Sequence, residues 1–248
     1  MIGEGRSDLL IAYIGESYDL QNCLGYWMSA VIVHELVLRD YWTDLLHAAN
    51  AVVPGLDVGT ELHGSELFGG EGPYSGIVPQ KRIDIVRLGL MTINRYQATV
   101  AVSANVPGTS ETPSLRDWRL GVLGTLIPQI EQVAYNADEF VVLVCDEEHS
   151  TTTKLIEMLH DRKTANGILG TPILETAMFA RSVYSPGVWP ADLVAFIERR
   201  LTLGYGDSGQ KLRTLRRLRA LYQDNLLQPV IVPGAAALPD SLITDSLT

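Results

Sequence analysis

Residues 140–151 read Phe-Val-Val-Leu-Val-Cys-Asp-Glu-Glu-His-Ser-Thr, and this stretch decides the fold class. Its first part, 140–145, is an unbroken apolar run rich in valine, which is typical of a strand buried on both faces of a sheet. Acids follow at once, and Ser150 or Thr151 is suited to cap a helix that runs to about residue 162. A buried strand that opens into acids and then a helix is typical of an α/β protein with a ligand site at its strand ends.

Two further apolar runs of strand length, 9–14 and 25–34, flank the polar stretch 17–22, which is short enough for a hairpin-like return. Helical spacing and proline starts predict helices at residues 37–53, 79–94, 113–135, 190–201 and 208–227. Apolar β-rich runs predict strands at residues 96–102 and 173–179. Pro128 is expected to kink or split its helix, and the glycine-rich segment 57–76 is expected to be a loop with at most one short strand.

Length and composition predict one domain. The 248 residues are 46% hydrophobic, which is ample for a single α/β core over residues 1–227. Residues 228–248 are short of charge and carry prolines, so we expect a loosely attached tail there.

The charge and the cysteines restrict the function classes. The formal net charge of -10 argues against a surface built throughout to coat nucleic acid, although a local basic patch is compatible with it. Cys23 and Cys145 lie far apart in apolar runs, which indicates neither a disulfide framework nor a cysteine metal site. The N-terminus lacks the features of a secretory signal, and no apolar run approaches the ~20 residues needed to cross a bilayer. We therefore expect a cytoplasmic protein with no membrane partner.

Four acids stand at predicted element ends or in the polar loop: Glu16, Glu61, Asp146 and Asp192. Hard cations such as Mg²⁺ bind carboxylate oxygens and water, and two of them ~3.5 to 4 Å apart can hold a phosphodiester and activate water. Acids at strand ends and helix starts also serve simply as caps or as solvated groups. The pattern alone leaves both interpretations open.

Four blocks in order carry a resemblance to a known family. They are Ile-Ala-Tyr-Ile-Gly-Glu-Ser from Ile11, Glu-Leu-His-Gly-Ser-Glu-Leu from Glu61, Val-Leu-Val-Cys-Asp-Glu-Glu from Val142, and Pro-Ala-Asp-Leu-Val-Ala-Phe from Pro190. Together they resemble the domain-of-unknown-function 3800 family, which is similar to RNase H-like nucleases. The resemblance implies an RNase H-like mixed central sheet with flanking helices and a metal-dependent nuclease site.

One departure from the family pattern concerns the first strand. The pattern expects an aspartate where this chain has Gly15, and a glycine where it has Tyr18. In RNase H-like sites that aspartate commonly bridges two metal ions, so three interpretations follow: Glu16 or Asp19 substitutes, the site holds one weakly bound metal, or catalysis is lost. Neighbouring strand residues point to opposite faces, so Glu16 cannot take the place of residue 15 without a bulge.

His63 follows Glu61 by two residues in the glycine-rich loop. It is a candidate to bind metal or to move a proton to the leaving group, and the alternative is a solvated side chain.

A basic stripe stands out late in this acidic chain. Residues 199–219 contain seven basic residues and one acid, Asp207. Four of them, Lys211, Arg213, Arg216 and Arg217, are candidate nucleic-acid contacts whose binding would depend strongly on salt. The alternative is a solvated helix face opposite a leucine stripe.

Two functions are therefore expected. The first is a divalent-metal-dependent phosphodiesterase, a nuclease for DNA or RNA, in which Glu61, Asp146 and Asp192 hold Mg²⁺ or Mn²⁺, Glu16 assists as a further ligand and His63 aids proton transfer. The second is a non-catalytic module that binds nucleic acid or protein on a degenerate RNase H-like scaffold. The substitution Gly15→Asp is expected to separate them by restoring metal affinity only to a degenerate site.

Overall fold

The structure, a computed structural model, describes residues 9–18, 25–106, 115–146, 152–166, 171–174, 176–204 and 208–233. Its strands are β1 (Leu9–Tyr18), β2 (Tyr26–His34), β3 (Thr99–Val106), β4 (Phe140–Asp146), β5 (Met178–Ala180) and β6 (Val230–Pro233). Its α-helices are α1 (Leu38–Val52), α2 (Gly64–Gly69), α3 (Pro79–Arg95), α4 (Leu115–Ala137), α5 (Thr152–Asn166), α6 (Val188–Leu203) and α7 (Gly209–Arg219).

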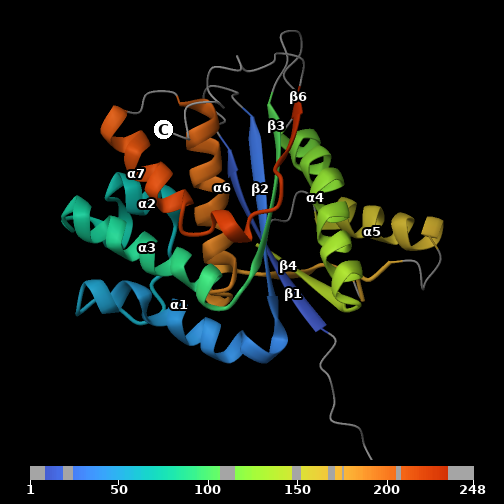
Figure 1. Cartoon of the computed structure of the whole chain (residues 1–248), viewed down its shortest axis with the longest axis horizontal. Helices are drawn as coiled ribbons and strands as arrows, with labels where there is room; N and C mark the ends of the chain where they lie inside the picture. Colours follow the sequence, from blue (N-terminus) through green and yellow to red (C-terminus); the bar gives the residue numbers. More distant parts are fainter. Residues whose placement is uncertain are drawn as a thin grey trace, which may run out of the picture.

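The strands form one six-stranded sheet in the order β5-β4-β1-β2-β3-β6 (Figure 1). β1, β2 and β3 pair antiparallel in succession, which confirms the hairpin-like return after β1. β4 pairs parallel to β1, β5 parallel to β4, and β6 parallel to β3. The predicted α/β class, with a mixed central sheet and flanking helices, is confirmed.

Helices cover both faces of the sheet. α1, α2, α3, α6 and α7 lie on one face, and α4 and α5 lie on the other (Figure 1). The alternation of side chains along β1 follows these two layers: Tyr13 joins the core under α6, whereas Ala12 and Ile14 join the core under α4. By the same alternation, Gly15 faces α6 and Glu16 faces α4.

Some predicted elements differ from the observed ones. α4 continues through Pro128 without a break in the helix. The loop before α3 contains the short helix α2 instead of a strand, and this helix ends at Gly70 in the left-handed conformation with φ +73°. Ile173 makes only an isolated bridge to Val141, so the last predicted strand is reduced to β5.

The prediction of a loosely attached tail from residue 228 is wrong for residues 230–233. Val230–Pro233 forms β6, which pairs with β3 in the register Ser103↔Val230. The β-branched run Val-Ile-Val suits an edge strand, and the proline stands at its end. The sheet therefore extends past residue 227, and residues 234–248 lie outside the described part of the chain.

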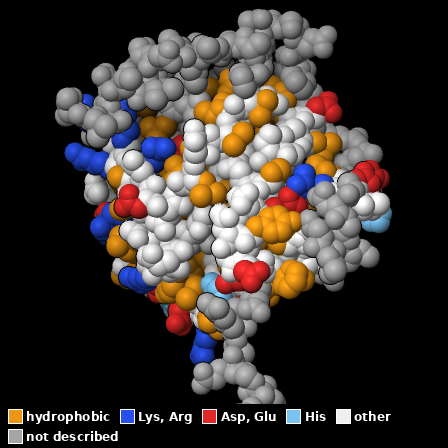
Figure 2. Space-filling view, turned by 45° about the vertical axis from the view of Figure 1, so that its right-hand side comes forward, with side chains coloured by type: hydrophobic (Ala, Val, Ile, Leu, Met, Phe, Trp, Pro, Cys, Tyr) orange, Lys and Arg blue, Asp and Glu red, His pale blue; other side chains and the backbone are white. Residues whose placement is uncertain are grey.

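The surface carries locally basic areas although the chain is acidic overall. On the face in Figure 2, most Lys and Arg side chains lie in the left half of the view.

None of the helices in the described ranges has the length and apolar character needed to span a bilayer.

Candidate active site

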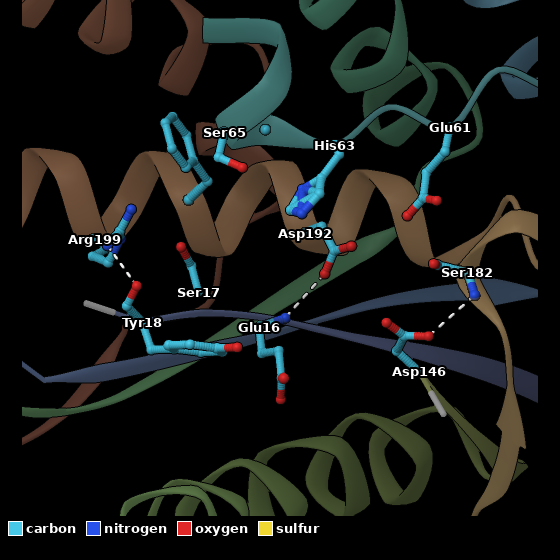
Figure 3. Close-up of a pocket in the computed structure, with 12 residues that line it drawn as sticks. Glu16, Ser17, Tyr18, Glu61, His63, Ser65, Asp146, Ser182, Asp192 and Arg199 are labelled. Carbon is cyan, nitrogen blue, oxygen red and sulfur yellow. Dashed lines mark hydrogen bonds between the residues drawn. The ribbon is translucent and has the colours of Figure 1, made fainter. Parts of the chain in front are cut away.

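A cleft of about 510 Å³ lies where β1 and β4 end, with α6 and the loop before α2 above it (Figure 3). β1 and β4 are parallel neighbours, so their carboxyl ends meet at one edge of the sheet. The cleft is lined by Glu16, Ser17, Tyr18, Glu61, His63, Gly64, Ser65, Asp146, Ser182, Asp192, Phe196 and Arg199.

Gly15 lets α6 approach the sheet closely. A Cβ atom at this position would lie 2.3 Å from the backbone nitrogen of Asp192 and 2.6 Å from the carbonyl carbon of Ala191. Its register partner on β2 is Ser29, whose hydroxyl donates a 2.6 Å hydrogen bond to the carbonyl oxygen of Ala191. Gly15 and Ser29 therefore form a pair of small residues on which the start of α6 rests.

Asp192 occupies the space that a larger side chain at position 15 would need. Its Oδ1 atom lies 2.5 Å from the place of a Cβ on Gly15 and accepts a 3.0 Å hydrogen bond from the backbone N–H of Glu16. Burial raises the pKa of Asp192 well above its usual value. The negative charges of Glu16, Asp146 and Glu61 raise this pKa further, and the Glu16 N–H partly offsets the shift.

Asp146 is the last residue of β4 and is half-buried. Its Oδ1 atom accepts a 3.1 Å hydrogen bond from the backbone N–H of Ser182. The carbonyl of Ser182 in turn accepts a 2.8 Å hydrogen bond from the indole N–H of Trp189 in α6. This chain of contacts fixes Asp146 relative to the helix that carries Asp192.

Glu61 and His63 enter the cleft from the loop before α2. The buried Leu62 anchors this loop, and the hydroxyl of Tyr74 donates a 2.5 Å hydrogen bond to the carbonyl oxygen of Glu61. His63 is exposed and immediately precedes α2. Gly64 packs against α6, since a Cβ there would lie 2.9 Å from the ring of Phe196.

The carboxylate of Glu16 turns away from the other acids, as Figure 3 shows. It lies 3.2 Å from Nε of Arg119 on α4, and it accepts a hydrogen bond from the hydroxyl of Tyr26. Burial raises the pKa of Glu16, Arg119 and Tyr26 lower it, and Asp146 raises it. The pairing of β1 with β2 is continuous from Leu10 to Tyr18, so no bulge carries Glu16 to the α6 face.

The structure thus brings Glu61, His63, Asp146 and Asp192 to one cleft and directs them into the same space (Figure 3). Within the described residues, no three His, Cys, Asp or Glu side chains are close enough to form a metal-binding group. Asp19, the other alternative for the missing acid, lies outside the described residues. The exposed α7 residues Lys211, Arg213, Arg216 and Arg217 do not line this cleft.

Several residues of the cleft were not singled out from the sequence. Phe196 and Arg199 follow Asp192 by four and seven residues, so a helical-face reading of α6 could have found them. Arg199 donates a 2.7 Å hydrogen bond to the carbonyl of Tyr18 and lies over the Phe196 ring. Ser182 acts through its backbone, and a backbone role leaves no signal in the sequence.

No protein-family model matches the chain, and no curated protein sequence matches it. Among solved structures, the chain is similar to one described as the PCNA:RNase HII complex from Archaeoglobus fulgidus. The match has 14% sequence identity and a TM-score of 0.39, and it covers 93% of this chain and 94% of the other.

Proposed function

We propose that this protein is a divalent-metal-dependent phosphodiester hydrolase that acts as a nuclease, and that it belongs with the domain-of-unknown-function 3800 family. One observation carries the proposal: Glu61, Asp146 and Asp192, which come from three separate parts of the chain, line one cleft together with His63. Carboxylates from distant segments that meet at the strand ends of an α/β sheet are suited to metal-assisted phosphoryl chemistry.

The donor chemistry of the cleft fits Mg²⁺ or Mn²⁺. Mg²⁺ is commonly bound by one or two carboxylates together with waters and substrate phosphate oxygens, so it does not require three preassembled protein ligands. The raised pKa of Asp192 reflects burial and the neighbouring negative charges. A cation beside Asp146 and Asp192 would relieve that repulsion, and these two residues are the ligands we propose first, with Glu61 completing the set.

When bound, the metal would supply charge neutralisation and an activated water. The residues of the chain position the reaction. The backbone N–H of Glu16 binds one oxygen of Asp192, and the backbone N–H of Ser182 binds one oxygen of Asp146, so both carboxylates are held in a defined orientation at the cleft. His63, exposed at the mouth of the cleft, would give a proton to the leaving oxygen.

Glu16 has a supporting role in this proposal. Its backbone N–H orients Asp192, and its carboxylate joins β1 to α4 through Arg119. It would act on the site through position and through its negative charge, in place of the direct metal contact expected from the sequence.

A non-catalytic binding module is the second candidate. One observation favours it: α6 packs directly on Gly15, so the fold has no space for the aspartate side chain that the family pattern expects at this position. The substitution Gly15→Asp would therefore displace α6 before it supplied a ligand, and it does not separate the two functions as the sequence suggested. Turnover has to be measured directly.

A cleavage assay tests the proposal. End-labelled single-stranded DNA, double-stranded DNA and RNA are incubated with the protein and Mg²⁺ or Mn²⁺, and the products are separated by size. Asp146→Asn and Asp192→Asn should abolish cleavage, whereas Asp224→Asn, which changes an exposed acid outside the cleft, should leave it intact. Absence of metal-dependent cleavage of all three substrates would overturn the hydrolase and favour the binding module.

A further inference from the structure

A second groove adjoins the carboxylate cleft. It has a volume of about 680 Å³ and lies between α2, α3, α6 and α7. Its lining includes Phe68 of α2, Arg82 of α3, Arg200 of α6 and Lys211 of α7. Ser65, Phe196 and Arg199 line both spaces, so one continuous surface leads from the acids into the groove.

The two spaces have opposite charge. The cleft contains the acids Glu16, Glu61, Asp146 and Asp192, whereas every charged residue of the described groove lining is a cation. These cations are Arg82, Arg199, Arg200 and Lys211. In a chain with a net charge of -10, a groove whose charged lining residues are all cations, next to a cleft lined by four acids, indicates an anionic ligand that runs between them.

The cations differ in their tasks. Arg82 donates hydrogen bonds of 3.1 Å and 3.4 Å to the carbonyl oxygens of Leu67 and Phe68, so it chiefly anchors α2. Lys211 is exposed in the first turn of α7. That end of the helix adds a partial positive charge to the groove, because its residues Ser208 and Gln210 also line it.

Arg199 and Arg200 hold their guanidinium groups beside the ring of Phe196. Their Cζ atoms lie 5.6 Å and 5.9 Å from its centroid. The ring of Phe68 lies 5.0 Å from that of Phe196, so two aromatic rings form an apolar wall beside the cations. Cations interleaved with aromatic rings are the usual components of a single-strand nucleic-acid channel.

We propose that this groove binds the sugar–phosphate backbone of a single nucleic-acid strand, one phosphodiester of which lies in the carboxylate cleft. The inference rests on the proposed nuclease function for the cleft, and it extends that function by assigning the path of the substrate. Arg199, which lines both spaces, would contact the strand where it passes from the groove to the acids.

The groove also separates the cations of α7. Lys211 lines it, whereas Arg213, Arg216 and Arg217 are exposed on α7 outside its lining. If α7 bound nucleic acid through its overall positive charge, all four cations would contribute equally to the affinity. Binding in the groove predicts a contribution from Lys211 and not from the other three. Arg213 and Arg217 are therefore matched controls on the same helix.

The test is a binding titration of the full chain in EDTA, so that no metal-dependent cleavage occurs. The probes are fluorescein-labelled oligo-dT and oligo-U of about 20 nucleotides, which exceeds the site of one binding module, and binding is followed by fluorescence anisotropy. Lys211→Gln and Arg200→Gln should each weaken binding by about three- to tenfold and reduce the salt slope by about 0.7. Arg213→Gln and Arg217→Gln should change affinity by less than about twofold.

Three results would overturn the proposal that the groove binds the strand. They are an equal loss of affinity in the control variants, no loss of affinity in Lys211→Gln, or no binding of the oligonucleotides by the unsubstituted chain. Because Lys211 is exposed, its variant is expected to fold, which keeps the test decisive if Arg200→Gln unfolds. Tighter binding of a labelled duplex of the same length would contradict the single-strand assignment. Binding in EDTA is independent of hydrolysis, so failure of the groove and failure of the nuclease function give different results.

Discussion

The backbone N–H of Glu16 donates a 3.0 Å hydrogen bond to Oδ1 of Asp192. This bond joins the end of β1 to α6, and it is formed because Gly15 brings the helix against the strand. The absence of an acid at position 15 is therefore part of the packing that sets Asp192 in the cleft.

The first prediction concerns that packing. Gly15→Ala should lower the free energy of unfolding by about 1 to 3 kcal/mol, because the added methyl group would overlap the backbone of α6 at Asp192. Urea denaturation measures the change. In the matched control, Gly124→Ala in α4, the methyl group meets no atom within 4 Å, and the substitution should be neutral or stabilising. Equal stability of the two variants would contradict the close approach.

The second prediction concerns pH. Burial and neighbouring charges raise the pKa of Asp192, so the folded state retains a proton at pH values where the unfolded chain has released it. Stability should therefore decrease as pH rises from the usual aspartate pKa toward the raised one. Asp192→Asn removes this dependence and still offers an oxygen to the Glu16 N–H, so it should be more stable than the unsubstituted chain at neutral pH.

Denaturation curves at several pH values measure that difference. The stability gap between Asp192→Asn and the unsubstituted chain should widen with pH and then level off above the folded pKa. If the difference in stability between the two proteins were the same at every pH, the pKa of Asp192 would not be raised in the folded state.

The third prediction concerns the ion pair between Glu16 and Arg119, whose side chains are 19% and 5% exposed. Arg119→Met leaves the Glu16 carboxylate without its cation and should destabilise the fold by about 3 to 5 kcal/mol. The double variant Glu16→Gln, Arg119→Met should recover part of that loss, since no uncompensated charge remains. A double-mutant cycle in urea checks this, and strictly additive effects would mean that the two groups do not interact.

The fourth prediction concerns His63. If it gives a proton to the leaving oxygen, His63→Gln should slow single-turnover cleavage by about 100-fold or more. Its affinity for an uncleaved strand in EDTA should stay unchanged. His47→Gln, which changes an exposed histidine of α1, serves as the control and should cleave at the normal rate. Normal cleavage by His63→Gln would remove His63 from the mechanism.

The strands were predictable where their apolar runs were unbroken. The apolar run 140–145 was predicted as a strand, and β4 contains these residues and Asp146. The antiparallel pairing of β1 with β2 followed from the short polar return. β6 was missed because its three β-branched residues stand beside prolines in a segment otherwise short of signals. Its pairing with β3 is a contact between distant segments, which local propensity does not encode.

The site was predictable in its acids more than in its geometry. The positions of Asp146 and Asp192 could be inferred from element ends, but the helix α6 that rests on Gly15 and Ser29 could not. The ion pair between Glu16 and Arg119 was also missed, because Arg119 lies on a helix far along the chain and no sequence motif surrounds it. Strand alternation did predict that Glu16 would face away from position 15.

Calorimetric titration with Mn²⁺ tests the central claim most directly. The claim is that Asp146 and Asp192 form a divalent-metal site in the cleft. The unsubstituted chain and the control Asp224→Asn should bind Mn²⁺ with the same affinity, whereas Asp146→Asn and Asp192→Asn should bind at least about tenfold more weakly. Equal Mn²⁺ binding by all four proteins would contradict the site.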